Sequence, residues 1–317
     1  MSHWLIHVAA GAIADASGRI LIAKRPEHAH QGGLWEFPGG KLVPGETPQA
    51  GLARELAEEL GIEVIASRPL IRVQHDYGDR RVLLDVHRVA AYRGVPEGRE
   101  GQPLDWLSPE AMDPTLFPDA DRPIITALQL PERYLITGAD PNDPNVFLDR
   151  LQQALSSGIR LVQLRAHGVG DAAYRRLVAP ALALCRQTGA KLILNRAPAV
   201  VADLDADGLH LPAALLATLA ERPGSASWLV GASCHNAADL TRAVALGLDY
   251  ALLSPVAATA SHPDAEPLGW EGFAELVAPV SLPVYALGGL RTQDLARAFE
   301  HGAQGIAGIR GLWPGST

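Results

Sequence analysis

The stretch GGKLVPGETPQAGLARELAEELGI, residues 39–62, leads from a glycine-rich turn into a helix with one acidic side. Glu55, Glu58 and Glu59 stand at i, i+3 and i+4, so their carboxylates share one arc of the helical surface. Like charges at this spacing repel by about 0.2–0.5 kcal/mol per pair. Leucines recur every four residues on the neighbouring stripe and predict a buried side. The acidic side is therefore either a solvated face or a site that takes a cation.

The 317-residue chain is longer than one typical hydrophobic core can hold, and its pattern of expected strands and helices changes near residue 132. We therefore predict two domains, residues 1–131 and 132–317. The formal net charge of −8 argues against binding of a nucleic-acid polymer or an anionic membrane. The chain has two cysteines, and its apolar start at 4–14 is too short to span a bilayer and lacks the flanks of a signal peptide. These features predict a cytoplasmic protein.

The two halves differ in their pattern of strands and helices. In the first half, strands are expected at 4–14, 19–25, 70–76 and 81–93, and a helix at 122–130. In the second half, short β-branched runs alternate with Ala- and Leu-rich helical stretches. The eight runs lie at 134–138, 160–166, 191–196, 207–211, 228–234, 250–256, 283–289 and 305–311. Eight alternations predict an α/β protein with a closed (β/α)₈ barrel, and an open doubly wound sheet is the competing architecture.

The opening stretch matches the Nudix box, GX5EX7REUXEEXGU with U an aliphatic residue, at every fixed position from Gly40 to Ile62. The first half thus resembles Nudix hydrolases, which implies an α/β/α sandwich with a mixed sheet. Carboxylate oxygens suit Mg²⁺, which would remove the repulsion between them, neutralise a polyphosphate and activate water. The resemblance implies Mg²⁺, with Mn²⁺ as a substitute, held by the Gly39 carbonyl and by Glu55, Glu58 and Glu59. It implies that Arg54 and Glu46 orient these ligands.

The resemblance extends beyond the box to MutT-type enzymes, which hydrolyse 8-oxo-dGTP to the monophosphate and pyrophosphate. It is carried by RPEHAHQGGLWEFPGGK, residues 25–41. It implies that Glu100, in EGQPLDW, is a further metal ligand or a base. It also implies substrate contacts from Arg25 to phosphate and from Phe37 to the nucleobase region, with further contacts from Gly40, Lys41, Asp79 and Arg80.

Residue 121 departs from the MutT pattern. In FPDADRP the base-reading asparagine of the family is replaced by Asp121. An amide both donates and accepts hydrogen bonds, whereas an ionised carboxylate only accepts and would repel the purine O6 unless it is protonated. The alternative role for Asp121 is the N-cap of the helix that follows. Selectivity for 8-oxoguanine is therefore open at this position.

Residues 133–312 resemble thiamine-phosphate synthase and its relative TenI, through GIRLVQLRAHG, KLILNR, GASCHNAADLTRAVALGLDYALLSPV and PVYALGGLRTQDLARAF. Several synthase residues are replaced. The expected lysine is His167, one metal-binding aspartate is Arg196, a second is lost in HLPAALL, and the phosphate loop TxTK reads TASH at 259–262. The residues that remain for a barrel ligand are Gln163, Arg165, Asn195, Ser233, Gly288 and Gly289.

These replacements argue against synthase activity. The barrel then either binds or isomerises a small phosphorylated, thiazole-like or pyrimidine-like ligand, or it is catalytically retired. The histidines near the strand ends lack metal-binding spacing, and burial explains Cys234 better than nucleophilic chemistry. These histidines are His167, His210, His235 and His262.

The leading hypothesis is a Mg²⁺-dependent nucleoside triphosphate pyrophosphohydrolase that removes 8-oxo-dGTP from the nucleotide pool and so avoids mutation. A first alternative is a thiamine-pathway enzyme whose Nudix domain hydrolyses thiamine pyrophosphate or an analogue. A second alternative makes the barrel a ligand sensor or a scaffold for the hydrolase. RNA decapping is less favoured, because no basic, aromatic-rich segment is visible.

Overall fold

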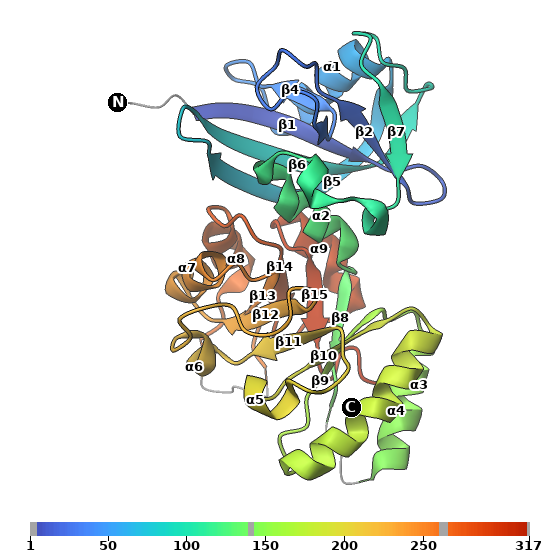
Figure 1. Ribbon diagram of the computed structural model, residues 1–317, viewed down its shortest axis with the longest axis vertical. Coiled ribbons are helices and arrows are strands. Elements are labelled where there is room, and N and C mark those ends of the chain that lie inside the picture. The colour runs from blue at the N-terminus through green and yellow to red at the C-terminus, as the bar shows by residue number, and fades with distance from the viewer. Residues whose placement is uncertain (1–4, 139–142, 260–265, 316–317) are drawn as a thin grey trace. The chain divides into compact units, whose positions relative to one another are not determined.

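The computed structural model describes residues 5–138, 143–259 and 266–315 (Figure 1). The chain divides into two compact units. The first comprises Met1–Gln129 with Ala278–Ser281, and the second comprises Leu130–Val277 with Leu282–Thr317. Among the helices described, none has the length and apolar character of a transmembrane segment.

The first unit is built on two β-sheets. The four-stranded sheet has the order β4-β1-β6-β5, in which β1 and β6 run parallel and the other pairs run antiparallel. Its strands are β1 (Leu5–Ile13), β4 (Gly39–Lys41), β5 (Glu63–Asp76) and β6 (Arg81–Arg93). The three-stranded antiparallel sheet has the order β3-β2-β7. Its strands are β2 (Ile20–Lys24), β3 (Trp35–Glu36) and β7 (Leu104–Leu107). The expected strands at 4–14 and 19–25 therefore belong to different sheets.

Two helices cover opposite faces of the four-stranded sheet, because alternate residues of a strand point to opposite sides. Ala9 of β1 lies in one apolar cluster with the buried leucines of α1 (Pro48–Leu60). Ala10, the next residue, lies in the other cluster with the isoleucines of α2 (Arg122–Gln129). Three 3₁₀ turns precede α2, at Pro109–Ala111, Pro114–Leu116 and Asp119–Asp121. The predicted α/β/α sandwich with a mixed sheet is confirmed.

The second unit is a closed barrel of eight parallel strands in chain order from β8 to β15 (Figure 1). Pairing of β15 with β8 closes it. The strands are β8 (Arg133–Ile136), β9 (Leu161–Leu164), β10 (Lys191–Leu194), β11 (Gly208–Leu211), β12 (Leu229–Cys234), β13 (Tyr250–Leu253), β14 (Val284–Leu287) and β15 (Gly305–Gly308). Each predicted run overlaps one strand, so the barrel prediction is confirmed and the open sheet is wrong.

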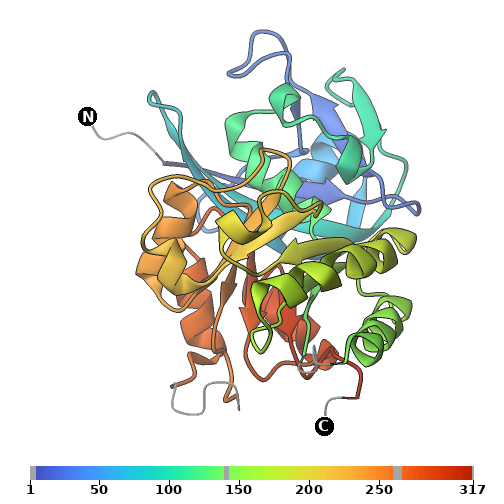
Figure 2. The same cartoon turned by 60° about the horizontal axis from the view of Figure 1, so that its bottom comes forward.

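Helices surround the barrel strands (Figure 2). They are α3 (Pro144–Ser156), α4 (Asp171–Gln187), α5 (Pro198–Val201), α6 (Ala213–Leu216), α7 (Ala237–Ala245), α8 (Gly269–Val277) and α9 (Leu295–Glu300), with a 3₁₀ turn at Thr292–Asp294. Large polar aromatic side chains fill the interior of the barrel. Tyr134, Tyr250 and Tyr285 are fully buried, and the hydroxyls of Tyr134 and Tyr250 lie 2.8 Å apart. The barrel is thus a packed core that leaves only its ends for ligands.

Candidate functional site

Helix α1 carries the acidic residues on a rigid element. The Thr47 hydroxyl accepts a hydrogen bond from the Ala50 N–H at 3.3 Å, and Pro48 occupies the first turn, where its missing N–H costs nothing. The helix ends at Gly61, whose φ of 70° is the left-handed conformation that glycine favours at a helix end. The leucines of α1 are fully buried, as predicted. The acidic face therefore has a fixed position and register.

The glycine pair of the box brings a strand backbone against this face. A Cβ on Gly40 would lie 2.2 Å from the carboxylate carbon of Glu55. A Cβ on Gly39, which has a φ of 148°, would lie 2.1 Å from the Ala9 carbonyl oxygen. Any side chain at either position would push β4 away from its neighbours. The pair thus allows the β4 backbone to pack directly on Glu55.

Arg54 links the carboxylates next to it. Its Nε and Nη2 donate to the two oxygens of Glu46 at 3.0 and 2.9 Å, and its Nη1 donates to Glu55 at 2.7 Å. These hydrogen bonds, first from Glu46 and then from Glu55, raise the pKa of Arg54. Those from Arg54 lower the pKa of Glu46. Arg54 therefore joins Glu46 and Glu55 in one network of hydrogen bonds, and the orienting role of Arg54 and Glu46 stays a prediction.

Glu59 lies at the centre of a group of like charges. Burial raises the pKa of its carboxyl to about 7. Negative charges on neighbouring carboxylates act in the same direction, those of Glu100, Glu55 and Glu36 in that order. Hard oxygen donors that repel one another fit a divalent cation. In the described part of the chain, however, no three carboxylate, imidazole or thiol side chains meet as a ready-made metal site. The Glu58 side chain points to solvent with 64% of its surface exposed.

The loop that carries Glu100 is fastened to the end of α1. The Glu100 N–H donates to the Gln102 side chain at 2.9 Å, and the Gln102 amide donates to the Glu59 carbonyl at 3.3 Å. Arg99 adds a hydrogen bond to the Ala57 carbonyl at 3.0 Å. These contacts bring Glu100 toward Glu59 although the two lie far apart in the sequence.

Glu36, which the sequence analysis did not select, connects this carboxylate group to the predicted base-binding residues. It lies on β3 and forms an ion pair with Arg25. Burial raises the pKa of Glu36, Arg25 lowers it, and the charge of Glu100 raises it. The signal in the sequence was one carboxylate between Trp35 and Phe37, two bulky apolar residues that predict a half-buried strand.

Asp121 is 6% exposed. Burial, with a further contribution from the charge of Glu36, raises its pKa to about 8, while Arg25 acts in the opposite direction. The carboxyl is therefore mostly protonated at neutral pH. Among the hydrogen bonds of the described residues, none joins it to the first turn of α2, so the structure does not support the N-cap alternative.

The other predicted substrate residues have varied environments. The Phe37 ring lies in the core, stacked on Phe117 with ring centres 5.8 Å apart. Arg25 Nε donates to the His30 carbonyl at 3.0 Å. Asp79 is exposed and Arg80 is partly exposed, and the Arg80 guanidinium donates to the Asp79 carboxylate at 2.8 Å in the turn between β5 and β6. Lys41 is exposed at the end of β4.

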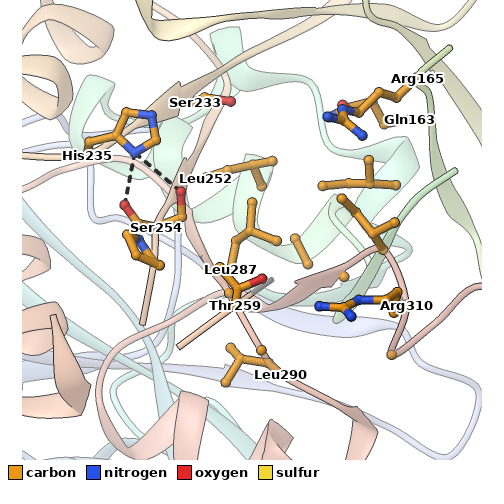
Figure 3. A pocket seen from close by; sticks show the side chains of 18 of the residues that line it. Gln163, Arg165, Ser233, His235, Leu252, Ser254, Thr259, Leu287, Leu290 and Arg310 are labelled. Carbon is orange, nitrogen blue, oxygen red and sulfur yellow. Dashed lines mark hydrogen bonds between the residues drawn. The ribbon is translucent and has the colours of Figure 1, made fainter. Parts of the chain in front are cut away.

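The barrel has a cavity of about 730 Å³ at the C-terminal ends of its strands, where barrel enzymes bind their ligands (Figure 3). All the predicted barrel-ligand residues line it, namely Gln163, Arg165, Asn195, Ser233, Gly288 and Gly289. The Asn195 amide donates to Gln163 at 2.7 Å, and Gln163 donates to the buried Tyr134 hydroxyl at 3.3 Å. Gly288 and Gly289 have φ values of 117° and 67°, which permit their tight turn beside Pro255.

The described histidines of the barrel and Cys234 have different surroundings. His210 is fully buried and lies 2.9 Å from the Ser233 hydroxyl, and His235 lies 2.9 Å from the Ser254 carbonyl. His167 is an exposed lining residue of the cavity. Cys234 is buried, which raises its pKa to about 12 and argues against a nucleophile. His262 and the loop at 260–262 lie outside the described residues.

Comparisons with known proteins assign both units. The family model "NUDIX domain" matches residues 9–127, and the model "Thiamine monophosphate synthase" matches residues 133–312. The chain belongs to both families, with a Nudix hydrolase domain followed by a thiamine monophosphate synthase-type barrel.

Three relatives show the range of functions. The 8-oxo-dGTP diphosphatase of Escherichia coli is 36% identical over 124 residues, which cover 39% of this chain and 96% of that protein. The CTP pyrophosphohydrolase of the same organism is 41% identical over 117 residues, covering 37% and 86%. The thiamine-phosphate synthase of Methanoregula boonei is 35% identical over 178 residues, covering 56% and 82%. The Nudix relatives are thus nucleotide pyrophosphohydrolases with different bases.

Proposed function

We propose that the first unit hydrolyses nucleoside triphosphates to the monophosphate and pyrophosphate, with 8-oxo-dGTP as its preferred substrate. One water is consumed, and the broken bond is a phosphoanhydride P–O bond. The observation that carries the base preference is Asp121, a buried carboxyl beside Glu36 and Arg25 that is mostly protonated at neutral pH. A protonated aspartate can donate a hydrogen bond as well as accept one, so Asp121 can take the place of the asparagine of MutT enzymes.

A protonated carboxyl offers one donor and one acceptor side by side, as an amide does. The edge of 8-oxoguanine presents O6, an acceptor, next to N7–H, a donor. In guanine the N7 atom carries no hydrogen and accepts instead, so it faces an acceptor oxygen of Asp121 without a hydrogen bond. A buried polar group left unpaired costs about 1–3 kcal/mol. The structure therefore supports discrimination between the oxidised and the ordinary purine.

Mg²⁺, or Mn²⁺ in its place, fits the hard oxygen donors of the first unit and when bound would neutralise phosphate charge and polarise water. The residues proposed to hold it are the Gly39 carbonyl and the side chains of Glu55, Glu58, Glu59 and Glu100. Arg54 keeps Glu55 oriented through its hydrogen bond of 2.7 Å. Glu36 holds Arg25 by an ion pair, beside the place where we propose that the phosphates bind.

Steady-state kinetics with Mg²⁺ on 8-oxo-dGTP, dGTP, CTP and thiamine pyrophosphate tests the proposal. We expect the highest kcat/KM for 8-oxo-dGTP. The 41% identity to a CTP pyrophosphohydrolase makes CTP the second candidate, and a preference for CTP would move the assignment to it. A preference for thiamine pyrophosphate would contradict a nucleotide substrate and favour a thiamine-related role for both units.

A further inference from the structure

A separate loop, residues 97–102, supplies hydrogen-bond donors to the C-terminal end of α1. The last carbonyls of a helix lack partners within the helix itself. The Glu59 carbonyl accepts from the backbone N–H of Arg99 at 2.9 Å, and the Ala57 carbonyl accepts from the Arg99 guanidinium at 3.0 Å. An arginine is well suited to this place, because its positive charge also faces the negative end of the helix dipole. Arg99 thus binds the end of α1 through both its backbone and its side chain.

Gly61, the last glycine of the Nudix box, makes room for this side chain. Its φ of 70° lies in the left-handed region that glycine favours at a helix end. A Cβ at this position would lie 2.4 Å from Nη2 of Arg99 and 2.5 Å from its Cζ. An alanine would therefore strain the backbone and also push the guanidinium away from the helix. The bare backbone of Gly61 lets the guanidinium lie directly over the end of α1.

Glu100 follows Arg99 directly and is held at the same end of the helix. Its N–H donates to the Gln102 side chain at 2.9 Å, and the Gln102 amide donates to the Glu59 carbonyl at 3.3 Å. Among the charges that raise the pKa of Glu59, that of Glu100 has the largest effect after burial. The two carboxylates are therefore neighbours because this loop is fastened to α1.

The charge of Arg99 gives its effect on metal binding a clear sign. Arg99 is exposed, and hydrogen bonds that are open to water contribute little to folding. A positive charge beside a group of carboxylates repels a cation that approaches them. By charge alone, removal of Arg99 would strengthen the binding of a divalent metal. Weaker binding after its removal would therefore come from the position of Glu100.

We propose that Arg99 is a positioning residue for the divalent metal, because it holds the 97–102 loop against α1 and so keeps Glu100 beside Glu59. This role rests on the proposed function, in which Glu59 and Glu100 both hold the metal. The metal site is then complete only while the loop is fastened to the helix. The affinity for the metal depends on a side chain that is not itself a ligand.

Binding of Mn²⁺ to the full chain without nucleotide tests this role, with free Mn²⁺ measured by electron paramagnetic resonance. We expect Arg99→Met to weaken Mn²⁺ binding about tenfold or more, which is the usual effect of losing a residue that orients a metal ligand. Glu100→Gln should weaken it at least as much. The double variant should bind no more weakly than Glu100→Gln alone, because both changes act on one ligand. Arg99→Lys should restore part of the affinity, since an ammonium group can still donate to a carbonyl.

Arg93→Met is the matched control. Arg93 is an exposed arginine at the end of β6 that pairs with Glu63 at 3.4 Å, so its loss removes one positive charge from the same unit without touching the loop. Its Mn²⁺ affinity should stay within about twofold of the wild type. Thermal unfolding without metal shows whether each variant keeps its fold. If Arg99→Met does not, Arg99→Lys with and without Glu100→Gln provides the same comparison.

Three results would overturn the positioning role. Mn²⁺ binding that Arg99→Met leaves unchanged or strengthens would show that only its charge matters. Losses that add in the double variant would show that Arg99 does not act through Glu100. An equal loss in Arg93→Met would show a general effect of charge. Failure of the proposed function is a different result, namely that the wild type binds Mn²⁺ with this dependence on Arg99 but hydrolyses no nucleoside triphosphate.

Discussion

The carboxylate group of the first unit and the cavity of the barrel have side chains of opposite charge. The first unit gathers Glu36, Glu55, Glu59 and Glu100. Burial first, and then the negative charges of the other three, raise the pKa of Glu59 to about 7. The barrel cavity has arginines and histidines and no carboxylate among its described lining. A carboxylate site can attract a polyphosphate only through a cation, whereas an arginine site can bind it directly. The contrast predicts that metal removal affects one site and spares the other.

The largest effect is expected for the carboxylate group. Glu59→Gln keeps the shape of the side chain and removes a charge from a crowded site, so kcat should fall by about 10²–10⁴-fold while the fold is kept. Kinetics with Mg²⁺ and thermal unfolding measure the two effects. Glu63→Gln is the control, because Glu63 is exposed and pairs only loosely with Arg93 at 3.4 Å. Unchanged turnover in the Glu59 variant would refute its role.

The next effect concerns Asp121, the residue that we propose reads the base. Because the pKa of Asp121 is raised to about 8, its carboxyl is protonated below that pH and loses its donor above it. The preference for 8-oxo-dGTP over dGTP should therefore decline as pH rises through about 8. Asp121→Asn should keep the preference and remove this pH dependence, and Asp121→Ala should lower it about tenfold or more at every pH.

The ratio of kcat/KM for the two nucleotides, measured between neutral and alkaline pH, checks this expectation. Glu36 and Arg25 are the charged groups that act on Asp121. A preference that is flat with pH in the wild type, or one that Asp121→Ala leaves intact, would show that another residue reads the base.

The sequence predicts features that depend on neighbouring residues better than features that depend on contacts made by the folded chain. The period of the leucines in α1 and the eight strand–helix alternations are local patterns, so the helix, its register and the barrel followed from neighbouring residues. The Gly39–Gly40 pair was placed by the box, but the steric reason for it needs the fold, since a Cβ on Gly40 would lie only 2.2 Å from the Glu55 carboxylate carbon. Glu36 was not predicted as a site residue, because a single acidic residue in a short strand usually faces solvent.

The protonation of Asp121 and the hydrogen-bond partners of Arg196 could not be predicted from the sequence. The first depends on burial and on the charge of Glu36, which lies 85 positions earlier in the sequence. The second depends on carbonyls of the loop after β9, which point at the guanidinium only once the barrel is closed. The replaced residue type predicted an altered metal site, and only the structure shows which carbonyls the Arg196 guanidinium binds.

A smaller effect is expected at Glu36. Glu36→Gln removes the ion pair with Arg25, so KM should rise by about tenfold while kcat changes little. Because the charge of Glu36 helps to raise the pKa of Asp121, the pH at which base preference is lost should also move down. Glu27→Gln, an exposed change in the loop that follows Arg25, is the matched control. A fall in kcat with KM and the pH profile unmoved would place Glu36 in the structure only.

The smallest effect tests whether the units act on each other. Arg165→Gln should change the kcat/KM of nucleotide hydrolysis by less than about twofold, because changes at sites without shared partners are independent. The same variant should lose its ligand in the barrel. If saturating barrel ligand shifts the hydrolysis rate in the wild type and not in Arg165→Gln, the barrel is a sensor for the hydrolase. Since coupling between binding sites is reciprocal, nucleotide binding would then also change the affinity of the barrel for its ligand, and titration of the barrel ligand with and without nucleotide measures that change directly.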